Sequence, residues 1–143
     1  MENNIYQLRD LLSSMKKTLD KLLAIEHEKT AVLEKNSVDE LNRIINDEQA
    51  LIMEHSSLER ERLELCGRLN AKTVSELYEL YPDSKEVLGE IHEQLIQTVN
   101  EIKKVSSINK QLLETKRQLV RLIMSQLGYE KESTTYDKKA QLT

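Results

Sequence analysis

The chain contains few of the residues that build turns and phosphate-binding loops. Its 143 residues include three glycines and one proline, and its aromatic residues are five tyrosines with no tryptophan or phenylalanine. A β-sandwich or barrel needs a turn about every 8–12 residues, so these folds are excluded. A nucleotide-binding loop needs clustered glycines, whereas Gly67, Gly89 and Gly128 lie far apart.

Disulfides, membrane spans and a secretion signal are also missing. The single cysteine, Cys66, cannot form an internal disulfide, and we expect it to pack as a small hydrophobic residue. No apolar run approaches the roughly 18 residues that a membrane span requires. The N-terminal sequence MENNIYQLRD has no basic segment followed by an apolar stretch, so it does not read as a secretory signal. Together these features predict a cytoplasmic protein without stable membrane insertion.

What the chain does contain is the composition of long helices. Hydrophobic residues make up 38% and charged residues 32%, and the apolar positions recur at helical spacing. The first segment shows this most clearly, with steps of three and four that place one apolar row along a narrow seam: Ile5, Leu8, Leu12, Met15, Leu19 and Leu22. We therefore predict an all-α fold.

Capping signals divide this helical pattern. Ser37 with Glu40, and Thr73 with Glu76, have the spacing of capping boxes, and Asp83 or Ser84 is placed to cap the last helix. We predict helices near 3–35, 37–70, 74–80 and 84–127. They form a long antiparallel helical hairpin or three-helix coiled-coil bundle with one short connecting helix. Residues 1–128 form one domain, and residues 129–143 form a flexible tail.

The predicted helices differ in length. At about 1.5 Å per residue the first two span ~50 Å each and the last ~65 Å. Part of the last helix therefore has no partner of equal reach, and the sequence leaves open which end overhangs.

No catalytic or metal-binding constellation is visible. His27, His55 and His92 are 28 and 37 residues apart, and no second histidine follows any of them at the four-residue spacing of a zinc protease helix. We expect these histidines to face solvent. His55 is the exception, because its position falls in an apolar row of the second predicted helix. The chain is therefore predicted to be neither an enzyme nor a carrier of a cofactor or metal.

The most informative segment is residues 119–127, LVRLIMSQL, in which six of nine residues are apolar. One helical seam needs only two or three apolar positions per seven residues. The excess has two interpretations: a core end closed by the hinge between helices, or a surface that binds another chain, either a partner's helix or a second copy.

Charge is unevenly distributed. Residues 1–102 carry 12 basic and 21 acidic groups, whereas residues 103–121 carry six basic groups and only Glu114 as an acid. Cations late in a helix suit its dipole, which is the plain interpretation of this segment. A docking surface for an acidic partner is the alternative. The net charge of −4 disfavours general nucleic-acid binding.

The chain resembles the FlgN family of flagellar type III export chaperones over roughly residues 5–127. The resemblance rests on the order and spacing of the helix breaks and on the segments at residues 28–33, 38–41, 48–51, 58–62, 73–77 and 109–113. Many members read Asn-x-x-Asn-x-x-Leu-Leu in the last helix. Here Asn109, Leu112 and Leu113 match that pattern, and Ser106 replaces the first asparagine.

The resemblance implies a chaperone that covers the C-terminal amphipathic helices of hook-associated proteins of FlgK and FlgL type. It would prevent their premature assembly and deliver them for export. Components of the export apparatus and a second copy of the chain are further candidate partners. The family binds clients through its C-terminal part, so the expected partner-binding residues are Val105, Ile108, Asn109, Leu112, Leu113, Leu119, Val120, Ile123 and Leu127. The rival hypothesis is a self-associating structural coiled-coil scaffold, and a more distant one is an adaptor that binds nucleic acid through residues 103–121.

The charge distribution generates a first prediction. The chain should show no measurable binding to duplex DNA or RNA at physiological salt, because its net charge is negative. Fluorescence anisotropy with labelled duplexes measures this directly. Micromolar binding that weakens steeply with added salt would instead favour the adaptor hypothesis.

Overall fold

The computed structural model describes residues 2–128, and four helices account for nearly all of them. The predicted all-α fold is confirmed, and within these residues there is no strand. The helices are α1 (Glu2–Lys35), α2 (Val38–Arg68), α3 (Val74–Leu80) and α4 (Ser84–Leu127), each within two residues of its predicted bounds. The predicted flexible tail, residues 129–143, lies outside the described residues.

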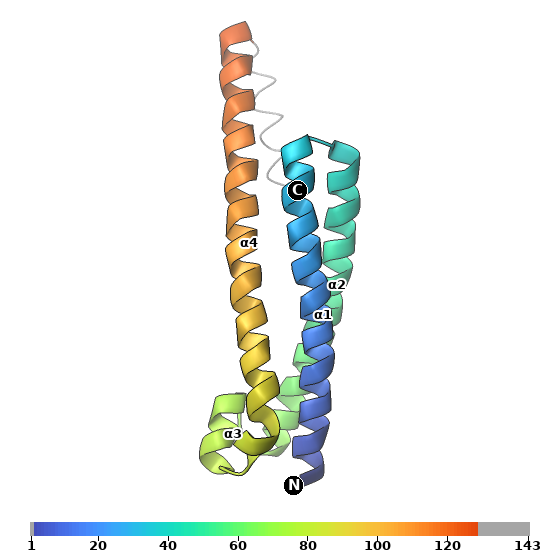
Figure 1. Cartoon of the computed structure of the whole chain (residues 1–143), viewed down its shortest axis with the longest axis vertical. Helices are drawn as coiled ribbons and strands as arrows, with labels where there is room; N and C mark the ends of the chain where they lie inside the picture. The colour runs from blue at the N-terminus through green and yellow to red at the C-terminus, as the bar shows by residue number, and fades with distance from the viewer. Residues whose placement is uncertain (1, 129–143) are drawn as a thin grey trace.

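Helix α1 is the centre of the arrangement. It packs against both α2 and α4, and in Figure 1 it lies between them. The chain rises along α1, returns antiparallel along α2, turns through α3 at the bottom of the view and rises again along α4 (Figure 1). Helices α1 and α2 thus form the predicted antiparallel hairpin, and α4 lies parallel to α1.

The turn between α1 and α2 takes only two residues, Asn36 and Ser37. Asn36 adopts the left-handed conformation with φ of 61°, which asparagine tolerates better than most residues. The Ser37 hydroxyl accepts a hydrogen bond from the Glu40 amide at 3.4 Å. The predicted break and its cap are therefore confirmed, and the tight turn fixes the upper end of the hairpin.

The cap of α3 is confirmed with one difference. The Thr73 hydroxyl accepts a hydrogen bond from the Glu76 amide at 3.1 Å, as the spacing predicts. The Glu76 carboxylate, however, accepts from the backbone amide of Lys72 at 2.7 Å, one residue before the cap. It therefore ties the start of α3 to the preceding linker.

The predicted side-chain cap of α4 is wrong. Asp83 is already helical, with φ of −67° and ψ of −19°, and makes no capping bond. The Ser84 hydroxyl instead donates to the carbonyl of Tyr81 at 2.6 Å. The first amides of α4 need no cap, because those of Ser84, Lys85 and Glu86 each bond to the carbonyl three residues earlier.

The largest apolar core lies at the α3 end of the molecule. The row predicted along α1 faces it, from Ile5 to Leu19, and Leu22 lies partly buried against it. Leu77 from α3 and Leu88 from α4 are fully buried there. Cys66 is buried in the same core as a free thiol, as expected of a small hydrophobic residue. This core fixes α3 and the lower halves of the long helices.

Helix α4 extends past the turn between α1 and α2. Lys116 lies level with Leu33 and Asn36, to which its ammonium group donates hydrogen bonds. Residues 117–127 continue for about 16 Å beyond that level, and Figure 1 shows the end of α4 standing clear of the hairpin. The overhang that the helix lengths require is therefore at the C-terminal end of α4, and we call residues 117–127 the α4 end.

The uneven core predicts an uneven response to truncation. Leu8→Ala should lower the free energy of unfolding by about 2–5 kcal/mol, because the fully buried side chain leaves a cavity. Leu122→Ala, a matched change at a side chain that is 56% exposed, should shift it by less than about 0.5 kcal/mol. Urea denaturation followed by circular dichroism compares the two. Equal losses would mean that the α4 end is packed in solution.

Candidate partner-binding surface

The α4 end presents several large apolar side chains to solvent. Leu119 is 54%, Leu122 56%, Ile123 45% and Leu127 64% exposed. They are uncovered because α1 and α2 end at the Asn36–Ser37 turn, below this level. The interpretation of residues 119–127 as a core end closed by the hinge is therefore wrong for this arrangement.

Two sides of α4 contribute to this surface. Ile108, Leu112, Leu119 and Leu122 follow one another at steps of four, seven and three, which places them along one side of the helix. We call these four residues the apolar row. Ile123 lies seven residues after Lys116, on the side that faces α1 lower down. Above the turn that side has no α1 residue to cover it, so it joins the apolar row in one surface.

The structure divides the nine residues expected to bind a partner into three groups. Ile108, Leu119, Ile123 and Leu127 are exposed, and Leu112, Leu113 and Val120 are half-buried. Val105 and Asn109 are buried, so neither is accessible to a partner here, and we leave both out of the surface proposed below. Leu122 is exposed as well, but it is not among the nine expected residues. Its place in the apolar run of residues 119–127 was the signal.

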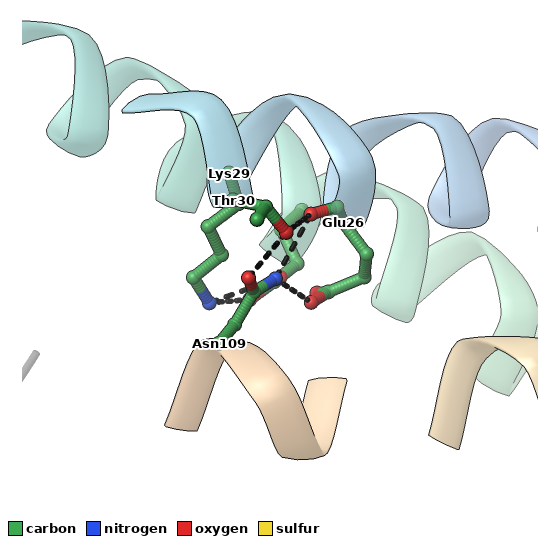
Figure 2. Close-up of polar contacts among 5 residues, drawn as sticks. Glu26, Lys29, Thr30 and Asn109 are labelled. Carbon is green, nitrogen blue, oxygen red and sulfur yellow. Dashed lines mark hydrogen bonds and ion pairs between the residues drawn. The ribbon is translucent and has the colours of Figure 1, made fainter. Parts of the chain in front are cut away.

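Asn109 instead fastens α4 to α1. Its amide nitrogen donates to the backbone carbonyl of Glu26 at 2.9 Å and to the Glu26 carboxylate at 3.0 Å. Its amide oxygen accepts from the Thr30 hydroxyl. Figure 2 shows Asn109 reaching from α4 to these α1 groups. Since the side chain is only 2% exposed and uses both of its polar ends, it fixes the register of the two parallel helices.

The same level of the molecule contains an ion pair between α1 and α2. Lys29 lies 3.3 Å from the Glu48 carboxylate, and both side chains are largely buried. We call Glu26, Lys29, Thr30, Glu48 and Asn109 the polar layer; it draws on all three long helices. The buried Val32, Leu33 and Ile44 above it do not belong to the core at the α3 end. The polar layer thus lies between the main core and the part of the molecule next to the α4 end.

Glu48 is the titratable group whose environment is most altered in this layer. Burial raises its pKa from the ordinary 4.5 to about 7, and a hydrogen bond with the Glu26 carboxyl group acts in the same direction. The Lys29 ammonium opposes the shift. The carboxyl group of Glu48 therefore changes its charge near neutral pH.

Lys116 provides a second polar fastening above the layer. Its ammonium group donates to the Leu33 carbonyl and to the Asn36 side-chain oxygen, at the C-terminal end of α1. A cation is favoured there because the last carbonyls of a helix carry partial negative charge. With Asn109 and Lys116 both committed to α1, the start of the overhang is set at residue 117.

The histidines do not form a site. His27 is exposed, as expected, whereas His92 is half-buried and its Nδ1 lies 3.1 Å from the Tyr78 hydroxyl, which links α3 to α4. Across residues 2–128 no group of three or more histidine, cysteine, aspartate and glutamate side chains could hold a metal ion. None of the helices in this range is both long and apolar enough to span a membrane.

Comparison with known proteins agrees with the resemblance. The model of the family described as FlgN protein matches residues 1–143. The chain is also 28% identical over 128 residues to the uncharacterized protein YvyG of Bacillus subtilis (strain 168), an overlap that covers 85% of this chain and 80% of YvyG. No solved structure matches it.

The polar layer generates a prediction on pH. Between about pH 5 and 7 the folded chain holds a proton on Glu48 that the unfolded chain has released, because the pKa of this group is about 7 when folded and 4.5 ordinarily. The contribution of Glu48 to stability then falls as pH rises through this window, by about 1–3 kcal/mol in total. Burial lowers the pKa of His92, which acts in the opposite direction. Urea denaturation at pH 5, 6, 7 and 8 measures the slope.

Two variants control this experiment. Glu48→Gln should flatten the slope between pH 5 and 8, because the group that titrates is gone. Glu54→Gln, at an exposed position of the same helix, should leave it unchanged. A slope that is the same in the unaltered chain and in Glu48→Gln would contradict the assignment.

Proposed function

The chain belongs to the FlgN family, and on that premise we propose that it is a cytosolic chaperone for hook-associated proteins of FlgK or FlgL type. At the level of the family it is a flagellar export chaperone and not an enzyme. The α4 end binds the C-terminal amphipathic helix of such a client. Binding prevents premature assembly and delivers the client, through contacts with export-apparatus components, for export.

The observation that carries this proposal is the uncovered apolar surface beyond the turn between α1 and α2. Leu119, Leu122, Ile123 and Leu127 belong to a well-formed helix, yet each is nearly half exposed or more. Because each of these side chains is about half buried already, covering the rest of it contributes about 1–1.5 kcal/mol. The four together supply about 3–6 kcal/mol toward the cost of association, and the half-buried apolar residues beside them add to it.

The shape of the surface favours a helix as the partner. Residues 117–127 make about three helical turns, and the apolar row continues downward through Leu112 to Ile108 beside the hairpin. An incoming helix can lie along this side of α4 at the usual 8–10 Å separation of packed helices. Its apolar side chains would be spaced at three and four residues, as in other helix-on-helix recognition.

The binding surface generates the central prediction. Leu119→Ala and Ile123→Ala should each weaken capture of a FlgK- or FlgL-type C-terminal segment by about 30- to 1,000-fold, or ~2–4 kcal/mol, if they are binding hot spots. The melting temperature and helicity of both variants should stay close to those of the unaltered chain, because neither side chain closes the core. Isothermal titration calorimetry and thermal denaturation give the two measurements.

Ile96→Ala is the matched control. Ile96 lies on the same helix and is 48% exposed, close to the 45% of Ile123, but it lies far below the α4 end. This variant should bind as the unaltered chain does. A Leu119 or Ile123 variant that melts much earlier yet still binds, after correction for its folded fraction, would identify these residues as core. An unaltered chain that binds no such segment and self-associates instead would favour the scaffold hypothesis.

A further inference from the structure

One side of α2 carries an apolar row that the other helices leave largely uncovered. Val38, Ile45 and Ile52 follow at intervals of seven residues, and Leu63 lies eleven residues, or three turns, after Ile52. Val38, Ile52 and Leu63 are exposed, and Ile45 is half-buried. We call these four residues the α2 row. The exposed residues one turn from Ile45 and Ile52 are uncharged: Asn42, Gln49 and Ser56.

The α2 row borders the polar layer on the side that leads to α4. Glu48 lies one turn after Ile45 and one turn before Ile52, and its carboxyl group hydrogen-bonds with that of Glu26 on α1. Glu26 in turn accepts hydrogen bonds from Asn109 of α4 at 2.9 and 3.0 Å. Along the helices, Ile45 and Ile52 therefore lie within about 6 Å of this polar connection to α4.

The opposite side of α2 borders a hollow to which α4 does not contribute. The hollow has a volume of about 410 Å³, and its lining within residues 2–128 comes from α1 and α2: Gln7, Asp10, Leu11, Ser14, Leu58, Glu61, Glu64, Leu65 and Arg68. Ile52 lies six residues before Leu58, which places it about 120° around α2 from that side. The hollow and the α2 row thus lie on different faces of the hairpin, and the row lies on the face next to α4.

Two lysines of α4 lie on the side of that helix turned toward α2. Lys103 and Lys110 are exposed, and neither makes a hydrogen bond or ion pair with another residue of the described range. His92 lies 18 residues before Lys110, which is five full turns, so it shares this side of α4. Burial lowers the pKa of His92, and the positive charge of Arg62 on α2 acts in the same direction. We call Lys103 and Lys110 the lysine pair.

The helix dipole does not account for the lysine pair. Its stabilising effect on cations is confined to the last turn of a helix. Lys103 and Lys110 lie 24 and 17 residues before Leu127, the last residue of α4. Two like charges about 10 Å apart along the helix are therefore left without a counter-charge. A partner with carboxylates at the same spacing would supply one.

The α2 row and the lysine pair are held apart by α1. Helices α2 and α4 each pack on α1 and have almost no contact with one another, and Figure 1 shows α1 between them. A further helix packed along this face at the usual 8–10 Å separation would meet the α2 row on one side. On its other side it would meet the lysine pair and the half-buried Leu113, which lies one turn after Asn109.

This face is separate from the apolar row of α4. Asn109 faces α1, and the residues on either side of it, Ile108 and Lys110, each lie about 100° around the helix in opposite directions. Ile108 belongs to the apolar row and Lys110 to the lysine pair. A helix bound along the apolar row therefore leaves the lysine pair free.

We propose that the α2 row and the lysine pair form a second docking surface, which binds an amphipathic helix with acidic residues along one flank. The inference goes beyond the proposed function and does not depend on client binding at the α4 end. Apolar contacts with the α2 row supply affinity. Opposite charges across an interface contribute to partner selection and to the rate of encounter more than to affinity, and this is the role of the lysine pair.

Three synthetic peptides of 21 residues test the proposal. All share one leucine-based apolar face, and one flank carries glutamate, glutamine or lysine at seven-residue spacing. Fluorescence polarisation with the full chain gives the dissociation constants at 150 mM and 500 mM sodium chloride. At 150 mM the glutamate peptide should bind about 3- to 10-fold more tightly than the glutamine peptide, and the lysine peptide more weakly than either. The differences should shrink at 500 mM, where exposed charges are screened.

Variants at neighbouring positions locate the apolar contact. Ile52→Ala should weaken binding of the glutamate peptide by about 5- to 10-fold. Met53→Ala removes the next side chain of α2, which is 73% exposed but points about 100° away, and should change binding by less than about twofold. Leu119→Ala, at the α4 end, should also leave binding of this peptide within about twofold.

Charge reversal locates the cations in the same way. Lys110→Glu should remove or invert the preference for glutamate over glutamine. Lys104→Glu reverses an exposed lysine that lies about 120° around α4 from Lys110, and it should keep the order of the three peptides. Melting temperatures of all variants should stay close to that of the unaltered chain, because these side chains are exposed.

The outcomes separate this inference from the proposed function. Peptide binding that is lost in Leu119→Ala but unaffected by Ile52→Ala would uphold helix capture at the α4 end and overturn the second surface. Binding lost in Ile52→Ala alone would support the second surface even if no FlgK- or FlgL-type segment binds the chain. Equal affinity for the three peptides, or no binding of any, would overturn the proposal.

Two further results would assign the surface to a different occupant and overturn the proposal. One is a dimer in sedimentation that dissociates in Ile52→Ala, which would identify a second copy of the chain. The other is a gain of about tenfold or more in affinity for the glutamate peptide when Glu130→Gln and Asp137→Asn are combined. That gain would identify the chain's own residues 129–143 as the occupant.

Discussion

The alignment of α4 with α1 is the constraint on which the rest of the structure depends. Asn109 holds it through the carbonyl and carboxylate of Glu26, and Lys116 holds it again at the end of α1. These contacts are polar and directional, so they specify one register of α4 against α1. Packing between leucines alone is not directional and would allow several registers. A shift of α4 by two turns toward α3 would draw Ile123 down to the level that Lys116 now occupies. The exposed surface of the α4 end therefore follows from an asparagine and a lysine that are not part of it.

Apolar packing and polar fastening are separated along the length of the molecule. Fully buried leucines gather at the α3 end, where all four helices and the linker before α3 meet. Toward the opposite end the polar layer interrupts the core, and Glu48 there has a pKa of about 7. Local stability follows buried apolar contacts, so the half of the molecule next to the α4 end depends more on hydrogen bonds and on pH. The exposed surface of the α4 end therefore rests on a part of the molecule that is separate from the main core.

The sequence predicts those parts of the fold that depend on local chemistry. The steps of three and four from Ile5 to Leu22 identify α1, and Ser37 and Thr73 identify the starts of α2 and α3, because a cap is satisfied by residues three positions away. The direction and register of α4 are not local. They depend on the pairing of Asn109 with Glu26, residues 83 positions apart, and no spacing rule connects these two. The same limit explains why Val105 and Asn109 were expected on the surface while Leu122 was not. The sequence shows the apolar excess of residues 119–127. Which of these residues are covered depends on how far the α1–α2 hairpin extends along α4, and the sequence does not give that length.

The two-residue turn at Asn36 and Ser37 has a consequence beyond closing the hairpin. Because α1 and α2 both end at this turn, its position determines how many residues of α4 remain uncovered. Each helical turn added to both hairpin arms would cover about 5.4 Å more of α4 and convert the corresponding leucines from surface to interior. Each turn removed would expose Leu112 and then Ile108 more fully. Insertions or deletions at this turn would therefore change the length of the uncovered surface with no substitution in α4.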